Sequence, residues 1–551
     1  MPLFSLSLTS VALVSSLGAL PMQRDLAGPP KQAGLEPIII GEHRFERRQL
    51  DNGVKAVAVH DDGADLSIFI AVAAGNRNET ADTTGLAHLT EHALFTGTPT
   101  TGVDQHEKTI VEWGGESNAF TRDDYTMYYD HSFPVEHLDT VLKMEADRFS
   151  NLSFEEFAVL HERHRLEVEE KHSYRTAEGR AEQLEHAFFE VHPYRHGLRD
   201  EEGHTKGPGL SVAQIKAFYQ AHYQPNRFAV VVVGPVEAQK ALDSIEAAFG
   251  PLKGKAAAVA IPQDVVAEKP RTKRIPSELP RDRFVACWLT PALDHPDQAA
   301  LNILATMLGR EQLPSGEVLT VSIGGRIDAD IFQVGWSGSQ QTAKEVSALM
   351  GSYRDGSIFK DKSKAEVLKE VTAMMESSHA KAPLRARPYF SLAGTLAWHE
   401  AFGMADSLAN WGDAVSAVSV ADVQRVAKQW LDPTRGTLIV FEGTGEEVAP
   451  LPSDKDALYE AAAEAAETGD YDRAIEAYTR LLAMNPDRMY TVIYLYERGA
   501  LRLERNDFDG AIADFETALD VVDYPAVREI LEETHARKAR AMRGEFEDSE
   551  T

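Results

Sequence analysis

The stretch His88-Leu-Thr-Glu91-His92 decides which fold and chemistry this sequence predicts. On a helix each residue turns by about 100°, so His88, Glu91 and His92 share one face. Two neutral imidazoles four residues apart can bind one zinc ion, and a carboxylate beside them can reach a water molecule on that ion. We therefore expect a metal-binding helix; the alternative is a solvated helix that carries two histidines by chance.

The residues around this stretch predict a scaffold of strands. Residues 51–53, Asp-Asn-Gly, are typical of a turn, and residues 54–59 and 66–73 are apolar runs typical of strands. A helical segment then begins at Gly85 and continues to about Phe95. Two strands followed by a helix with metal ligands are a suitable support for a metal site.

A catalytic zinc site needs a third protein ligand. Residues 154–175 have a helical composition without Pro or Gly, and they include Glu162 and Glu169, seven positions apart. Seven residues make nearly two turns, so these two carboxylates share one face. Glu170 and Glu167 are the alternatives. Glu170 lies one position beyond the seven-residue spacing from Glu162, and the side chain of Glu167 projects about 140° away from that of Glu162 around the helix.

This set of residues resembles the pitrilysin family of zinc metallopeptidases, which uses the inverted order His-x-x-Glu-His. Glu169 follows His92 by 77 positions, and residues 75–79, 85–88 and 95–98 also resemble the family. The resemblance implies that His88, His92 and Glu169 hold Zn²⁺. It also implies that Glu162 is an acidic neighbour that orients a ligand.

The same resemblance implies a reaction. Glu91 would be the general base that takes a proton from the attacking water, and the peptide bond would be hydrolysed without a covalent intermediate. The expected activity is that of a zinc metalloendopeptidase acting on peptides or unfolded polypeptides.

A second segment resembles the active-site edge strand of the family. It comprises residues 114–121 followed by residues 125–129. In the family this edge pairs with an extended substrate by strand addition. We therefore expect Asn118, Ala119 and Phe120 to contact the substrate; the alternative for Asn118 is a turn residue before a strand.

Other reactive side chains offer weaker candidates. Cys287 is the only cysteine and lies in the apolar run 284–289, which predicts a buried, inert thiol. His161, His164 and His172 could form a second metal cluster near Glu169, but surface histidines are the favoured interpretation.

The expected fold class is α+β, with two related α/β peptidase domains followed by an all-α helical-repeat domain. We place the catalytic zinc peptidase domain at residues 41–260, the second peptidase-like domain at 261–450 and the repeats at 451–545. In the repeat region, residues 469–478 recur as residues 506–515, 37 positions later. This resembles two tetratricopeptide repeats, whose usual period is 34 residues. An ordinary pair of helical hairpins is the alternative.

The second domain departs from the family pattern. Active members supply an Arg followed by a Tyr seven residues later to hold the substrate. Here Arg310 is followed at that spacing by Glu317, and Arg326 by Gln333. The chain thus resembles the zinc-bearing half of a two-chain peptidase. We expect a heterodimer with a related chain, or a homodimer, and a possible further protein partner at the repeats. A non-catalytic binding or scaffold protein with the peptidase fold is the competing hypothesis.

The N-terminus predicts export. Residues 1–21 resemble a signal peptide because residues 3–20 are uncharged and largely apolar, although the usual positive start is missing. A misassigned start or a disordered tail is the alternative. Residues 22–40 have the composition of a linker. We expect a periplasmic or secreted protein with no membrane span after processing, and a cytoplasmic one if residues 1–21 are not a signal peptide.

The acidic balance restricts the partners. The chain has 56 basic and 86 acidic residues, a net charge of −30, which argues against nucleic acid and anionic membranes. It mildly favours basic peptide substrates, although solubility also explains it.

Overall fold

The computed structural model describes residues 35–535 with interruptions, of which the longest are residues 167–176, 196–208, 385–390 and 445–450. The predicted signal peptide, most of the predicted linker, and residues His161, His164, Glu169 and His172 lie outside the described residues. Among the described residues, no helix has the length and apolar character needed to cross a bilayer.

The first sheet has seven strands in the order β1-β2-β3-β7-β4-β6-β5. The pair β3–β7 is parallel and the other pairs are antiparallel. β3 and β4 confirm the strands predicted at 54–59 and 66–73, and β5 is an edge strand. The bounds are β1 (Ile38–Ile40), β2 (His43–Gln49), β3 (Lys55–His60), β4 (Asp65–Val72), β5 (Glu116–Thr121), β6 (Thr126–Pro134) and β7 (Phe228–Gly234).

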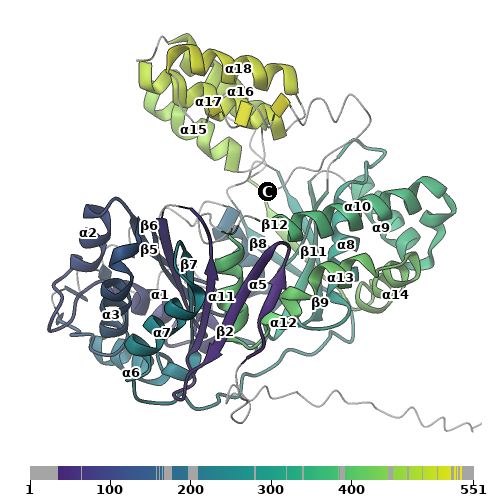
Figure 1. Ribbon diagram of the computed structural model, residues 1–551. Coiled ribbons are helices and arrows are strands. Elements are labelled where there is room, and N and C mark those ends of the chain that lie inside the picture. The colour runs from purple at the N-terminus through teal and green to yellow at the C-terminus, as the bar shows by residue number, and fades with distance from the viewer. Residues whose placement is uncertain are drawn as a thin grey trace, which may run out of the picture.

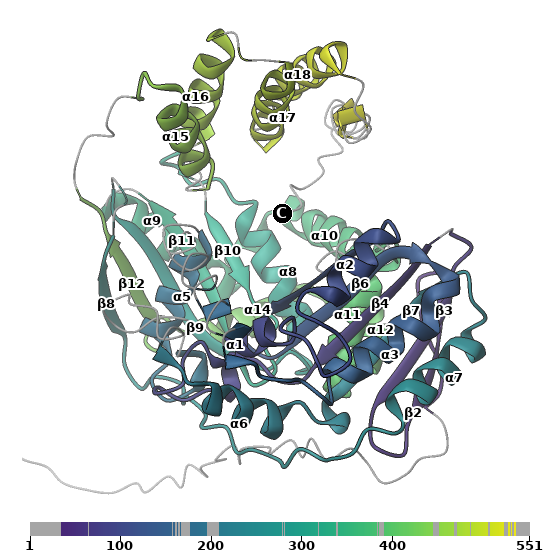
Figure 2. The same ribbon diagram turned by 90° about the vertical axis from the view of Figure 1, so that its left-hand side faces the viewer.

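Helices from the first half of the chain cover one face of this sheet (Figures 1 and 2). They share one apolar core with the inward side chains of the strands, including Leu89, Ile70 and Val232. The helix predicted at 85–95 is α1. The bounds are α1 (Leu86–Ala93), α2 (Gln105–Glu112), α3 (Leu138–Arg148), α6 (Val212–His222) and α7 (Ala238–Phe249).

The second sheet has five strands in the order β10-β11-β9-β12-β8, with its own helical layer and core. The strands are β8 (Arg271–Pro276), β9 (Arg283–Pro291), β10 (Thr320–Ile323), β11 (Ala329–Ser337) and β12 (Thr437–Glu442). The helices are α8 (Gln298–Gly309), α9 (Gln340–Asp355), α10 (Lys362–Ala380), α13 (Trp411–Ser416) and α14 (Val420–Trp430). Short 3₁₀ turns occur at η1 (Asn76–Asn78), η2 (Val135–His137), η3 (Pro193–Arg195), η5 (Pro225–Arg227) and η6 (Ser357–Lys360).

The first half of the chain contains the seven-stranded sheet and the second half contains the five-stranded sheet, and each half contributes helices that pack on the sheet of the other. α11 (Leu392–Ala401) and α12 (Ala405–Ala409) come from the second half but pack on the remaining face of the first sheet. In return, α5 (Ala177–Phe188) from the first half packs on the second sheet. Both faces of β7 are therefore covered, which explains why every residue of Phe228–Gly234 is buried. Each half completes the core of the other.

Buried ion pairs join the halves as well. The guanidinium of Arg326 donates to Asp123 in the β5–β6 turn at 2.8 Å, to Asp330 at 3.0 Å, and to Glu185 of α5. Arg77 pairs with Asp328 at 2.5 Å. These contacts hold the β5–β6 turn against the second half.

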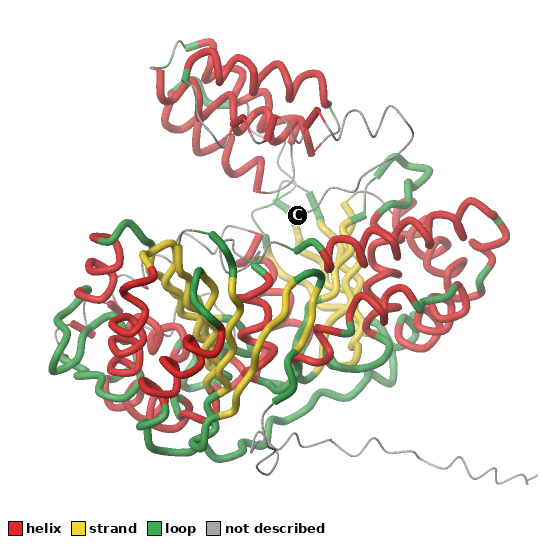
Figure 3. The backbone as a smooth tube through the Cα atoms, viewed as in Figure 1, coloured by secondary structure: helices red, strands yellow, loops and turns green. Residues whose placement is uncertain are grey.

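The C-terminal region is a separate group of helices, which Figure 3 shows apart from the two groups of strands. It consists of α15 (Lys455–Glu467), α16 (Tyr471–Ala483), α17 (Arg488–Glu504) and α18 (Phe508–Val521), and consecutive helices contact one another. Ala474 and Ala511 are buried, as are Tyr478 and Phe515. Small and aromatic residues thus pack between helices as the repeat pattern predicts. The assignment to tetratricopeptide repeats remains a prediction.

Candidate metal centre

The helix that carries the candidate ligands is anchored at its N-terminus. Gly85 precedes α1 with φ of 84°, a left-handed conformation that favours glycine. The carboxylate of Glu79 accepts hydrogen bonds from the backbone N–H groups of Gly85 at 3.0 Å and Ala87 at 2.7 Å. Because a negative charge at a helix N-terminus is stabilising, the buried Glu79 caps α1 and fixes its position.

The structure brings His88, Glu91 and His92 together on one face of α1. One ligand atom of each residue lies within 4.8 Å of the others, and the two imidazole ring centroids are 4.9 Å apart. Glu91 and His92 are buried, whereas His88 is half-buried. The helical spacing predicted this arrangement, and its donors are those that zinc prefers.

Glu162 lies beside His92. Its Oε2 is 3.0 Å from Nδ1 of His92, and the carboxylate is buried. Since a carboxylate can only accept, Nδ1–H is the donor, which leaves Nε2 of His92 with the lone pair that a metal needs. This is the geometry expected of an acidic neighbour that orients a ligand. Described residues between 156 and 166 are helical, as predicted, but Glu169 lies outside the described residues, so its role stays a prediction.

Glu91 contacts a residue that sequence reasoning missed. The hydroxyl of Thr121, at the end of β5, donates to Oε2 of Glu91 at 2.6 Å. The hydroxyls of Tyr128 and Tyr223 lie 2.9 Å apart. Burial raises the pKa of both tyrosines, and the neighbouring Tyr223 raises that of Tyr128 further; the charge of Glu91 adds to both shifts, so both hydroxyls stay neutral. Strand alternation puts Thr121 on the same side as Ala119, but only the packing of α1 against β5 shows that this side faces α1.

The predicted substrate-binding residues lie on the edge strand β5. Asn118 is exposed and lies inside the strand rather than in a turn before it, while Ala119 and Phe120 are half-buried. β5 pairs with β6 and ends the sheet order, so within the described residues its outer edge has no neighbouring strand. Such an edge is what strand addition requires.

A second group of possible ligands is formed by His106, Asp130 and Glu145, which are all buried. Nε2 of His106 lies 3.0 Å from Asp130, and Arg148 donates two hydrogen bonds of 2.6 Å to the carboxylate of Glu145. Burial raises the pKa of Glu145 to about 7, against the opposing effect of Arg148. Arg148 already provides the positive charge here, so we favour the α1 group as the metal centre.

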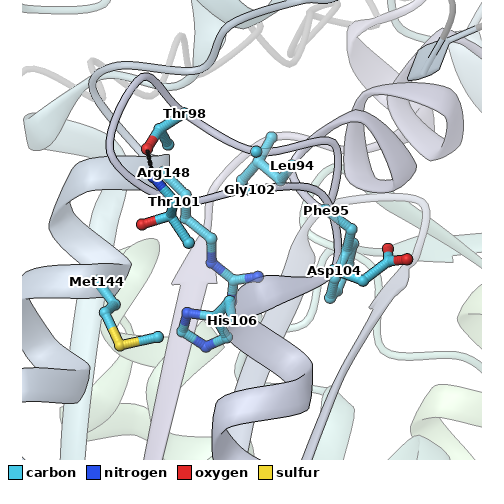
Figure 4. Close-up of a pocket in the computed structure, with 10 residues that line it drawn as sticks. Leu94, Phe95, Thr98, Thr101, Gly102, Asp104, His106, Met144 and Arg148 are labelled. Carbon is cyan, nitrogen blue, oxygen red and sulfur yellow. Dashed lines mark hydrogen bonds between the residues drawn. The ribbon is translucent and has the colours of Figure 1, made fainter.

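The cavity beside this second group is too small for a substrate. It measures about 10 Å³, and its lining includes Phe95, His106, Met144 and Arg148 (Figure 4). Roughly 10–15 Å³ of such space holds one water molecule. The cavity is therefore no alternative to the edge of β5 for binding a peptide.

The second half offers no arginine of the family type at the two candidate positions. The guanidinium of Arg326 forms ion pairs with Asp123, Asp330 and Glu185, and the Arg326 side chain is 12% exposed. Arg310 contacts Met374 of α10 at 3.4 Å between Nη2 and Sδ. Cys287 is fully buried, which confirms the predicted burial, and burial raises the pKa of its thiol.

Comparisons with known proteins identify the family of this chain. Residues 55–201 match a family described as Insulinase (Peptidase family M16), and residues 209–350 match the Peptidase M16 inactive domain. Together the two matches cover more than half of the chain. The protein belongs to the M16 family of insulinase- and pitrilysin-like peptidases and contains its N-terminal and C-terminal domains.

Three relatives illustrate the family. Zinc protease PqqE of Helicobacter pylori is 26% identical over 72% of this chain and 93% of its own length. A probable mitochondrial-processing peptidase subunit beta of Arabidopsis thaliana is 24% identical over 56% of this chain and 57% of its own length. The periplasmic protease PqqL of Escherichia coli has a similar fold, with a TM-score of 0.59 and 18% identity over 78% of this chain and 50% of that one.

Proposed function

We propose that this protein is a zinc-dependent endopeptidase that hydrolyses peptides or unfolded polypeptides by a metal-activated water. The observation that carries the proposal is the face of α1, where His88, Glu91 and His92 converge and Glu162 fixes the ring of His92. The similarity to a zinc protease of H. pylori supports it.

Each residue has a defined task in the proposed reaction. His88, His92 and Glu169 would hold the ion, and Glu162 keeps Nε2 of His92 available by accepting from Nδ1–H. When bound, zinc supplies Lewis acidity that polarises the scissile carbonyl and acidifies water. Glu91 takes the proton of the attacking water and then passes it to the leaving amine. The edge of β5 at Asn118–Phe120 aligns an extended substrate by strand addition.

A second candidate function is the catalytic half of a two-chain peptidase. It is favoured because Arg326 is held in ion pairs between the two halves and Arg310 packs against α10. The similarity to a processing peptidase subunit also supports a partner chain. The partner would be a related chain in a heterodimer, or a second copy. The C-terminal helices offer a further surface for a protein partner. The similarity to a periplasmic protease supports a periplasmic location.

The test compares the wild-type protein with Glu91→Gln. Zinc content is measured by atomic absorption, and hydrolysis is followed with an unfolded polypeptide. We expect about one zinc per chain in both proteins and a loss of turnover of about 10²- to 10⁴-fold in the variant. Equal activity in both would contradict the mechanism. Bound zinc without hydrolysis in the wild type would favour the two-chain function.

A further inference from the structure

Thr121 links the substrate edge to the catalytic carboxylate. It is the last residue of β5, and its hydroxyl lies 2.6 Å from Oε2 of Glu91, which is itself buried. An ionised carboxylate only accepts hydrogen bonds, so the hydroxyl of Thr121 is the donor. A hydrogen bond to a charged acceptor is about twice as strong as one between neutral groups. This contact therefore joins α1 directly to the edge strand.

The surroundings of Thr121 direct its proton towards Glu91. Thr126 is opposite Thr121 in the β5–β6 register, and their hydroxyl oxygens are 3.4 Å apart. Thr126 donates its own proton to the carbonyl of Ala74 at 2.9 Å. Thr126 can therefore act towards Thr121 only as a competing acceptor, and the carboxylate of Glu91, at 2.6 Å against 3.4 Å, is the nearer and stronger one. The turn that follows is closed by the bond from the N–H of Arg122 to the carbonyl of Tyr125 at 2.8 Å.

We propose that Thr121 is a positioning residue that sets the rotation of the Glu91 carboxylate. The last torsion of a glutamate has broad, roughly two-fold preferences, so the carboxylate plane needs an external constraint. Thr121 holds Oε2 in place and thereby fixes how the carboxylate meets the attacking water. This inference rests on the proposed function, because it takes Glu91 as the general base.

The position of Thr121 predicts which of the two kinetic constants, kcat or KM, changes when its hydroxyl is removed. A substrate added to β5 would bind mainly through backbone groups, which a change in the Thr121 side chain leaves intact. Removing the hydroxyl should therefore lower kcat and leave KM nearly unchanged. A defect in β5 itself would raise KM instead, because the substrate edge would be disturbed.

The experiment uses the full chain with three variants. Thr121→Val removes the donor at nearly constant shape, and Thr121→Ser keeps the hydroxyl. Thr517→Val makes the same change on α18, where the exposed hydroxyl donates to the carbonyl of Ala513 in its own helix. We expect Thr121→Val to lose about 10- to 100-fold in kcat with KM within about two-fold. Serine should restore kcat to within about three-fold of wild type, and Thr517→Val should change neither kcat nor KM. All variants should keep their zinc.

Crystal structures of the zinc-loaded wild type and the valine and serine variants separate this inference from the proposed function. We expect the Glu91 carboxylate to rotate in the valine variant and to keep its wild-type orientation with serine. An unchanged carboxylate with valine, or serine kinetics as poor as valine kinetics, overturns the role of Thr121. If the zinc-loaded wild type hydrolyses no peptide, the proposed single-chain activity fails. The orientation of the Glu91 carboxylate in the three crystal structures then decides alone whether Thr121 positions it.

Discussion

Removing the carboxylate of Glu162 should weaken zinc binding without touching a ligand. Its Oε2 accepts from Nδ1 of His92 at 3.0 Å, and the exposed fraction of Glu162 is only 4%. A buried hydrogen bond that involves a charged group contributes about 1.5–3 kcal/mol. With about 1.4 kcal/mol for each ten-fold change, this predicts a loss of roughly 10- to 100-fold in zinc affinity.

Two substitutions of Glu162 should weaken zinc binding to different extents. Glu162→Gln keeps a carbonyl that can accept from Nδ1–H, so its zinc Kd should rise by about 10-fold, whereas Glu162→Ala should raise it by about 100-fold. Glu156→Gln is the matched control, because Glu156 is helical and exposed in the same segment. The assay is competition with a fluorescent zinc chelator at fixed pH. Wild-type affinity in Glu162→Ala would refute the assignment of Glu162 as the residue that orients His92.

Three further predictions concern stability. Burial lowers the pKa of His399 from its ordinary 6.5 to about 4, so its contribution is present above pH 6.5 and lost as the pH falls towards 4. The metal-free wild type should be more stable than His399→Gln in urea unfolding at pH 7, and this difference in unfolding free energy should shrink by about 3 kcal/mol between pH 7 and pH 4. A difference that stays constant over this pH range would contradict the prediction. Arg326→Met should cost about 3–5 kcal/mol of unfolding free energy, because it leaves three carboxylates without their cation. Residues 41–260 expressed alone should show no cooperative unfolding by circular dichroism, since the face that α11 covers would be exposed; a sharp transition would argue that the first half folds independently.

Local patterns predicted the parts of the molecule that depend on short sequence separations. The shared face of His88, Glu91 and His92 follows from helical periodicity, and the strands at 54–59 and 66–73 follow from apolar runs. The pairing of Glu162 with His92 spans 70 positions and came from a family resemblance. Local patterns alone could not have produced it.

Other features could not be predicted because they depend on how distant segments pack. The exchange of α5 and α11 between the sheets leaves no local signal, since a helix covered by either half has the same apolar face. The role of Thr121 depends on the packing of α1 against β5, which joins segments about 30 positions apart in the chain. The fixed ion pairs of Arg326 likewise follow from the docking of the two halves.

The central claim is that α1 provides a zinc site, and anomalous X-ray scattering at the zinc edge tests it most directly. Crystals grown with one equivalent of zinc should show a single anomalous peak about 2.0–2.2 Å from the imidazoles of His88 and His92 and a carboxylate oxygen of Glu169. A peak at the group of His106, Asp130 and Glu145 instead, or no peak on α1, would contradict the account.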